Sequence, residues 1–200
     1  MSFERRITTL LIGLVLTTIS FGQTAKPVEY LGVTGPISFN KVNYNLAWTS
    51  HPADNYYKQE YLAKGDVIER FKKLVLLEIL TGNTALKDIV AAKIVELKQM
   101  KQSNPLVQYE AFEKDGEVIL DFLVSQNAPD GNSVSIVERN VYRYKSLAEK
   151  SGKKGVLLFG VSERSYGNDV DLFLANLKAH RLDLITLVGA FNIPSITIAK

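Results

Sequence analysis

Two adjacent residues, Asp115 and Gly116, constrain the fold of this chain most, because they separate two runs of alternating apolar and polar residues. Such a dipeptide closes a two-residue hairpin turn, since glycine accepts a positive φ at little cost. A turn this short can join only antiparallel neighbours. The runs on either side, residues 107–112 and 118–124, are therefore predicted to be adjacent antiparallel strands.

Further segments with strand character lie on both sides of this hairpin. They alternate in part or are continuously apolar, and turn-forming residues separate them, notably at 49–55 and 128–132. Residues 74–80 suit a buried strand after a short helical turn, although 66–80 also fits a helix. The other predicted strands cover residues 37–48, 56–62, 134–144 and 156–164, with a last one at 195–198.

Two segments carry an apolar residue every three to four positions and are predicted to be amphipathic helices. The first spans residues 84–103, where Thr84 can cap the first amides and Pro105 stops the helix. The second begins at Asp169 as the N-cap and stops at Gly189. The predicted buried stripes consist of Leu86, Ile89, Val90, Ile94, Leu97 and Met100 in the first helix, and Val170, Phe173, Leu174, Leu177, Leu184, Ile185 and Val188 in the second.

The order of these segments predicts an α+β fold in which a twisted antiparallel sheet is packed with two amphipathic helices. A hairpin-linked sheet must cover an apolar face, and two helical stripes can do so. We expect a single domain over residues 36–200, because no repeat or change of composition divides it. A cystatin-like or NTF2-like α+β fold is the structural alternative.

The stretch 56–66, YYKQEYLAKGD, leads from a strand into a Lys-Gly-acid turn. With the order of the elements, it resembles the Mog1/PsbP-like α/β sandwich of small secreted bacterial proteins, over most of residues 36–190. The resemblance implies a non-enzymatic binding or assembly factor. It includes no catalytic motif, so it assigns a role to no residue, and a fold does not fix a function.

Residues 1–22 are typical of a secretory signal peptide. Two arginines precede the uncharged stretch 7–21, and its ending, Ser-Phe-Gly-Gln, resembles signal peptides of Gram-negative bacteria. A membrane span needs about 20 apolar residues, so this stretch is short for one, and an uncleaved membrane-tethered structural protein is the alternative. We therefore predict export to the periplasm or the extracellular space, with an extended leader over residues 23–35.

Charge and cysteine content exclude several classes of function. Cleavage after Gly22 removes two arginines and one glutamate, which lowers the formal charge from +3 to +2. A nucleic-acid footprint needs basic residues gathered on one face, so we expect no nucleic-acid partner. The chain has no cysteine, which excludes a disulfide scaffold and a thiol nucleophile.

Amphipathic aromatic residues make one segment a candidate docking surface. Tyrosine and tryptophan bury a large area and keep a polar group, so they are favoured where partners dock. The candidate binding residues are Trp48, His51, Tyr56, Tyr57 and Tyr61. The sequence therefore predicts a non-catalytic binding or accessory domain, and the expected partner is an unidentified protein, peptide or glycan of the cell envelope.

The sequence offers little support for an enzymatic function. The chain has two histidines, without a spacing typical of metal ligands, and no glycine-rich phosphate loop, so neither a metal nor a cofactor is predicted. An envelope hydrolase that uses His51 with a nearby carboxylate is the alternative.

We expect the exported protein to begin at Gln23. Mass spectrometry of the protein recovered from the cell envelope gives the N-terminus directly. A chain that retains residues 7–21 there would contradict cleavage and favour the membrane-tethered alternative.

Overall fold

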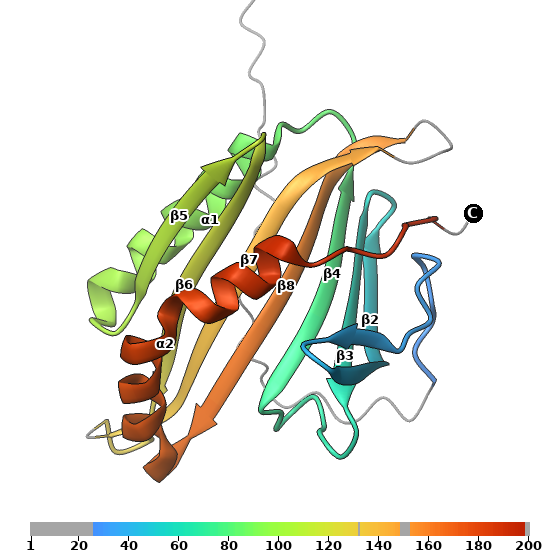
Figure 1. Ribbon diagram of the computed structural model, residues 1–200. Helices are drawn as coiled ribbons and strands as arrows, with labels where there is room; N and C mark the ends of the chain where they lie inside the picture. The colour runs from blue at the N-terminus through green and yellow to red at the C-terminus, as the bar shows by residue number, and fades with distance from the viewer. Residues whose placement is uncertain (1–25, 132, 149–152, 199–200) are drawn as a thin grey trace, which may run out of the picture.

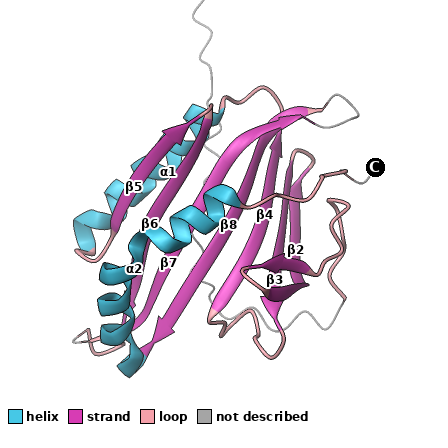
Figure 2. Ribbon diagram, in the orientation of Figure 1, coloured by secondary structure: helices cyan, strands magenta, loops and turns pink. Residues whose placement is uncertain are grey.

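The computed structural model describes residues 26–131, 133–148 and 153–198, which form one eight-stranded antiparallel sheet and two α-helices (Figures 1 and 2). The elements are β1 (Ile37–Phe39), β2 (Val42–Ala53), β3 (Tyr56–Ala63), β4 (Lys73–Thr81), α1 (Leu86–Ser103), β5 (Gln108–Lys114), β6 (Glu117–Asn127), β7 (Val134–Ala148), β8 (Lys154–Tyr166), the 3₁₀ turn η1 (Gly167–Asp169) and α2 (Val170–Ala190). The predicted signal peptide lies outside the described residues. Within those residues, no helix is long and apolar enough to cross a membrane.

Two four-stranded meanders make up the sheet and meet at its centre. The strand order is β1-β2-β3-β4-β8-β7-β6-β5, so the last strand of each meander pairs with the last strand of the other. In this central pair Leu77 lies opposite Phe159 and Val75 opposite Val161. Helix α1 carries the chain from the centre of the sheet to the far edge, where β5 begins (Figure 1).

The hairpin predicted at Asp115-Gly116 is confirmed. Both residues have positive φ, 53° and 77°, as a two-residue turn of this type requires. The turn joins β5 to β6, and Lys114 lies opposite Glu117.

Both faces of the sheet are buried at its centre, because β4 and β8 are apolar on both sides. On the face that carries α2, here called the front face, Val75 and Phe159 pack with Leu184 and Val188. The leader and the C-terminal tail complete this layer, with Leu31 fully buried.

The opposite face, here called the back face, carries α1. Leu76 and Leu120 pack there with Val90 and Leu97 of the helix. Figure 1 shows α2 crossing in front of the sheet and α1 lying behind β5 and β6.

The predicted fold class, an α+β fold with a twisted antiparallel sheet packed with two amphipathic helices, is wrong. The structure is mostly sheet, and its helices cover opposite faces instead of sharing one. The buried residues are Val90, Lys93 and Leu97 in α1, and Val170, Leu184 and Val188 in α2. The buried stripe of each helix is too narrow to cover one face of the sheet. Irregular segments and other strands cover the rest of each face.

Several local predictions also differ from the structure. Strand β2 continues through most of the predicted turn and ends at Ala53, with irregular register beside β3. The tail 195–198 forms no strand, although Thr197 N–H donates to the Leu31 carbonyl at 2.9 Å. The N-cap of α1 is Ala85 instead of Thr84, and no side chain caps it.

Asp121 of β6 fastens α2 to the front face. One carboxylate oxygen accepts from Arg139 Nε at 2.9 Å, and the other accepts from Arg181 Nε at 2.8 Å. The side chains of Asp121 and Arg139 are only 5% and 3% exposed. Because a buried guanidinium without a partner is costly, this pair must stay intact for α2 to remain in place.

We expect Asp121→Ala to lower the free energy of unfolding by about 3–5 kcal/mol, because it leaves Arg139 buried and unpaired. Urea denaturation measures this loss. Asp183→Ala removes an exposed carboxylate from the same helix, and we expect a change within about 0.5 kcal/mol. Equal losses in the two variants would contradict the anchoring role of Asp121.

Candidate functional site

Helix α2 bends at His180, whose backbone angles, φ −124° and ψ 27°, are not helical. A residue that leaves the helical conformation deprives nearby carbonyls of their usual donors. Arg139 supplies one from the sheet, since its Nη2 donates to the Arg181 carbonyl. The bend therefore lies above the buried Arg139–Asp121 pair.

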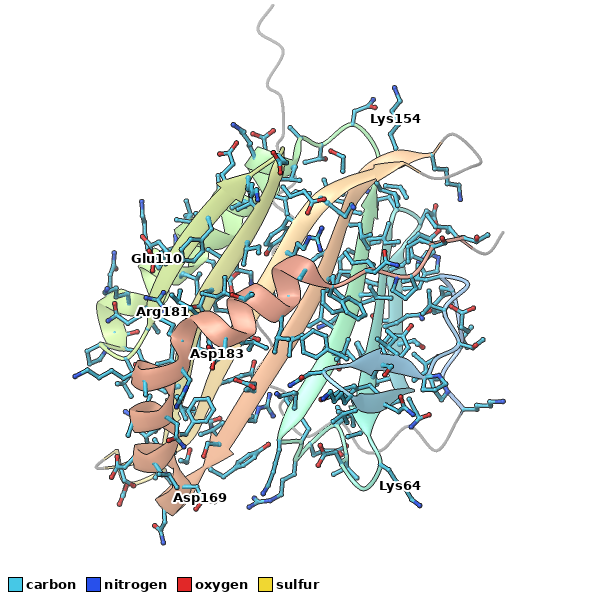
Figure 3. The ribbon with its side chains drawn as sticks, viewed as in Figure 1. Lys64, Glu110, Lys154, Asp169, Arg181 and Asp183 are labelled. Carbon is cyan, nitrogen blue, oxygen red and sulfur yellow. The ribbon has the colours of Figure 1, made fainter. Side chains whose placement is uncertain are left out.

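The bend creates a groove of about 660 Å³ on the front face. Both halves of α2 form its walls, Asn40 of the β1–β2 turn lies at one end, and strands β4, β7 and β8 supply its floor. The lining residues are Asn40, Lys72, Lys73, Arg139, Glu163, Arg164, Ser165, Tyr166, Asp169, Leu172, Phe173, Asn176, Leu177, His180, Asp183, Leu184 and Leu187. Figure 3 shows the two arms of α2, with Asp169 at the start of the first and Asp183 on the second.

A second hollow of about 540 Å³ extends the groove along α2. The two hollows share Asn40 and Leu187, so they are contiguous. The second is lined by the free side of β1 and by the chain that follows α2, including Phe191 and Pro194. Together they follow one flank of α2 along its length.

The walls of the groove carry both apolar and polar side chains of α2, and several charged groups on its floor and rim are already paired. Lys73 Nζ lies 2.7 Å from Glu163 Oε1 on the floor, and Arg139 is held by Asp121. His180 Nδ1 lies 3.4 Å from Asp183 Oδ2 on the rim, where both side chains are exposed.

Five polar side chains in the groove have no hydrogen bond or ion pair with any described residue. They are those of Asn40, Lys72, Ser165, Asp169 and Asn176. Their positions place a cation on the sheet side and an acid on the helix side. A ligand with apolar groups and both kinds of polar group would complement this arrangement.

Arg143 and Glu117 hold the second half of α2 from below. Arg143 Nη1 donates to the Phe191 carbonyl at 2.9 Å, and its Nε donates to Glu117 Oε2 at 2.6 Å. Lys145 lies 3.2 Å from the other Glu117 oxygen. Burial alone would raise the pKa of Glu117, but Arg143 and Lys145 outweigh it and hold that pKa below 4.5.

The structure divides the predicted binding residues between the two faces. Trp48 lies opposite Glu60, and Lys58 Nζ is 5.8 Å from the Trp48 ring, 2.7 Å from Glu60 and 3.5 Å from Glu78. Tyr56 belongs to the same cluster, because its hydroxyl forms a hydrogen bond with Glu78. Burial and this bond both raise the pKa of that hydroxyl.

His51, Tyr57 and Tyr61 lie on the front face. The rings of His51 and Tyr57 stack with centroids 4.2 Å apart, and His51 Nδ1 is 2.9 Å from the Tyr56 carbonyl oxygen. Tyr61 is fully buried and donates to the Val33 carbonyl at 2.7 Å. The five residues therefore form no common surface, and none of them lines the groove.

The geometry around His51 does not assemble a hydrolase site. No ion pair joins its ring to a carboxylate among the residues that the structure describes. Those residues also include no group of three or more histidine, aspartate or glutamate side chains able to hold a metal ion. The hydrolase alternative stays a prediction without a geometric arrangement behind it.

Sequence reasoning missed the groove because its lining comes from distant segments. Phe173, Leu177 and Leu184 belong to the predicted stripe of the second helix, but the expectation was that the sheet would cover all of them. Leu172, which is 65% exposed, breaks the period of that stripe. Leu182 is equally exposed on the same helix but lies outside the groove, so an exposed leucine alone does not locate the site.

The model of a protein family matches residues 31–193, which include every strand and both helices. No curated protein and no solved structure matches the chain. The resemblance to Mog1/PsbP-like domains stays a prediction.

We expect the contribution of Glu117 to stability to disappear in acid. Its folded pKa lies below its ordinary value of 4.5, so its contribution is complete above that pH and is lost as the pH falls through the lowered pKa. Unfolding free energies of the wild type and Glu117→Gln, measured from neutral pH to below 4.5, should converge as the pH falls. A constant difference across this range would show that the charge of Glu117 contributes nothing.

Proposed function

The chain belongs to this family, and we propose that it is an exported, non-catalytic binding domain that holds its partner in the groove beside α2. The observation that carries this proposal is the groove itself, whose walls come from both arms of a bent helix and from the sheet. Concave sites with apolar walls and a few polar groups are the usual form of a binding site.

The composition of the groove favours a peptide or a protein segment over a glycan. Phe173, Leu177 and Leu187 offer apolar contacts to side chains. The side chains of Lys72 and Asn176, which pair with no described residue, can bond to a backbone or to charged side chains.

Export is part of the proposal and rests on the sequence of residues 1–22. The uncharged stretch 7–21 behind two arginines supports secretion, and a cysteine-free chain is compatible with an oxidising compartment. The partner is therefore expected among molecules of the cell envelope.

A pair of leucines on α2 allows a matched test. Leu172 lines the groove and Leu182 does not, although both side chains are 65% exposed. We expect Leu172→Asp to remove partner binding, because it places a carboxylate on the apolar wall, while Leu182→Asp leaves binding unchanged. Both variants should fold, since neither residue is buried.

Site-specific photo-crosslinking in the producing cells measures the contact. A photoreactive residue in place of Asn176 should yield a discrete crosslinked species, which is lost with Leu172→Asp and kept with Leu182→Asp. The same residue at Val67, which is 54% exposed and lines neither hollow, is the control and should yield none of that species. Absence of any product from position 176, or its equal loss in both leucine variants, would overturn the proposal.

A further inference from the structure

Strand β5 forms one edge of the sheet, where no described strand lies on its outer side (Figure 1). In a two-residue hairpin the residues beside the turn bond to each other, so Lys114 and every second residue before it face β6. Tyr109, Ala111 and Glu113 consequently point their N–H and C=O groups outward. No hydrogen bond joins these groups to another described residue.

The side chains of β5 complement those of a second, antiparallel copy of the same strand. With Ala111 opposite the partner's Ala111, Tyr109 lies opposite the partner's Glu113, whose carboxylate can accept from the phenol. Lys114, which has no ion pair with a described residue, lies diagonally across from the partner's Glu110. Diagonal neighbours are about 7–8 Å apart in a sheet, within reach of these long side chains.

One like-charge approach arises in this register, and the structure already compensates for it. The two copies of Glu110 are diagonal neighbours, but Arg181 Nη2 lies 2.8 Å from Glu110 Oε2 in each chain (Figure 3). The acid is therefore neutralised from α2, and the edge carries no unbalanced repulsion there.

Helix α1 brings an apolar row to the same edge. Lys87 Nζ lies 3.0 Å from Glu113 Oε1 and Lys101 Nζ lies 2.8 Å from Gln108 Oε1, so the helix runs along β5. Ala91 and Val95 follow Lys87 at one-turn spacing on this flank, and Val95 is 52% exposed. They lie near the level of Ala111, where a second copy would bury them.

From these observations we propose that two copies of this chain associate through β5, in antiparallel register about Ala111, and form one continuous sheet. The outward N–H and C=O groups supply the bonds, the Tyr109–Glu113 and Lys114–Glu110 contacts fix the register, and Val95 is buried beside the axis. The β5 edge is separate from the groove, so this association does not depend on the proposed binding function.

Hydrogen exchange tests the pairing residue by residue. In concentrated protein we expect the amides of Tyr109, Ala111 and Glu113 to exchange slowly, and on dilution to exchange rapidly. The amides of Glu110 and Phe112, which bond to β6, should stay protected at both concentrations. Light scattering or sedimentation should show twice the mass of one chain in the concentrated sample.

Three substitutions separate this interface from a general loss of stability. Ala111→Pro removes an outward N–H without removing a β5–β6 bond, and we expect a monomer at every concentration. Lys114→Glu should weaken association at least tenfold, because it places a carboxylate beside the partner's Glu110. Val95→Lys should weaken association as well.

Matched controls carry the same chemical changes away from β5. Lys154→Glu alters an exposed lysine at the start of β8 (Figure 3). Val67→Lys alters a valine that is 54% exposed, close to the 52% of Val95. Both controls should associate as the wild type does. A wild-type chain that stays monomeric when concentrated, or a dimer that Lys114→Glu and Val95→Lys leave unchanged, would overturn the proposal.

Discussion

The carboxylate of Asp121 is the interaction on which the front face of this protein depends. It accepts from two guanidinium groups, Arg139 beneath it and Arg181 above it, and thereby joins the sheet to the helix. Two cations on one acid leave excess positive charge, and Glu110 offsets it from the outside. The hydrogen bond to Asp121 and the nearby acids raise the pKa of Arg181 above its ordinary value, so its guanidinium stays charged. The cluster therefore fastens α2 to the sheet.

This fastening also shapes the proposed binding site. The guanidinium of Arg139 bonds at the same time to Asp121 and to a carbonyl beside the bend of α2. Arg139, a side chain of β7 beneath the helix, thus determines where α2 bends. The first arm is then free to diverge from the second, and the space between the two arms becomes the groove. Stability of the front face and the shape of the site come from one set of charges.

The sequence predicted the local features of the fold better than the long-range ones. The Asp115-Gly116 hairpin follows from turn chemistry that involves only neighbouring residues, and both helices occur where apolar residues recur at helical spacing. The pairing of β4 with β8 joins segments that share no local pattern, so the covering of two faces could not be foreseen. A helical period shows that one side of a helix is buried but does not say against which face of a sheet.

The same limit applies to the candidate site. Tyr56 and Tyr57 are adjacent in a strand, so their side chains point to opposite faces and could not have served one surface together. Irregular register between Leu46 and Trp48 then changes which residues of β2 accompany them. The groove combines Lys72, Glu163 and Asp169, which lie far apart in the sequence. The helix bends at His180, and no proline or glycine there indicates the bend in the sequence.

The central position of β8 has a consequence for the order of events during synthesis. This strand is made last among the eight, yet both meanders need it, because β4 on one side and β7 on the other pair with it. Until residues 154–166 have been synthesised, β4 of the first meander lacks its neighbour β8, and the sheet cannot be completed. Contacts this distant in sequence form slowly. The topology thus postpones completion of the sheet until almost the whole polypeptide is available, so the two meanders reach their final arrangement together.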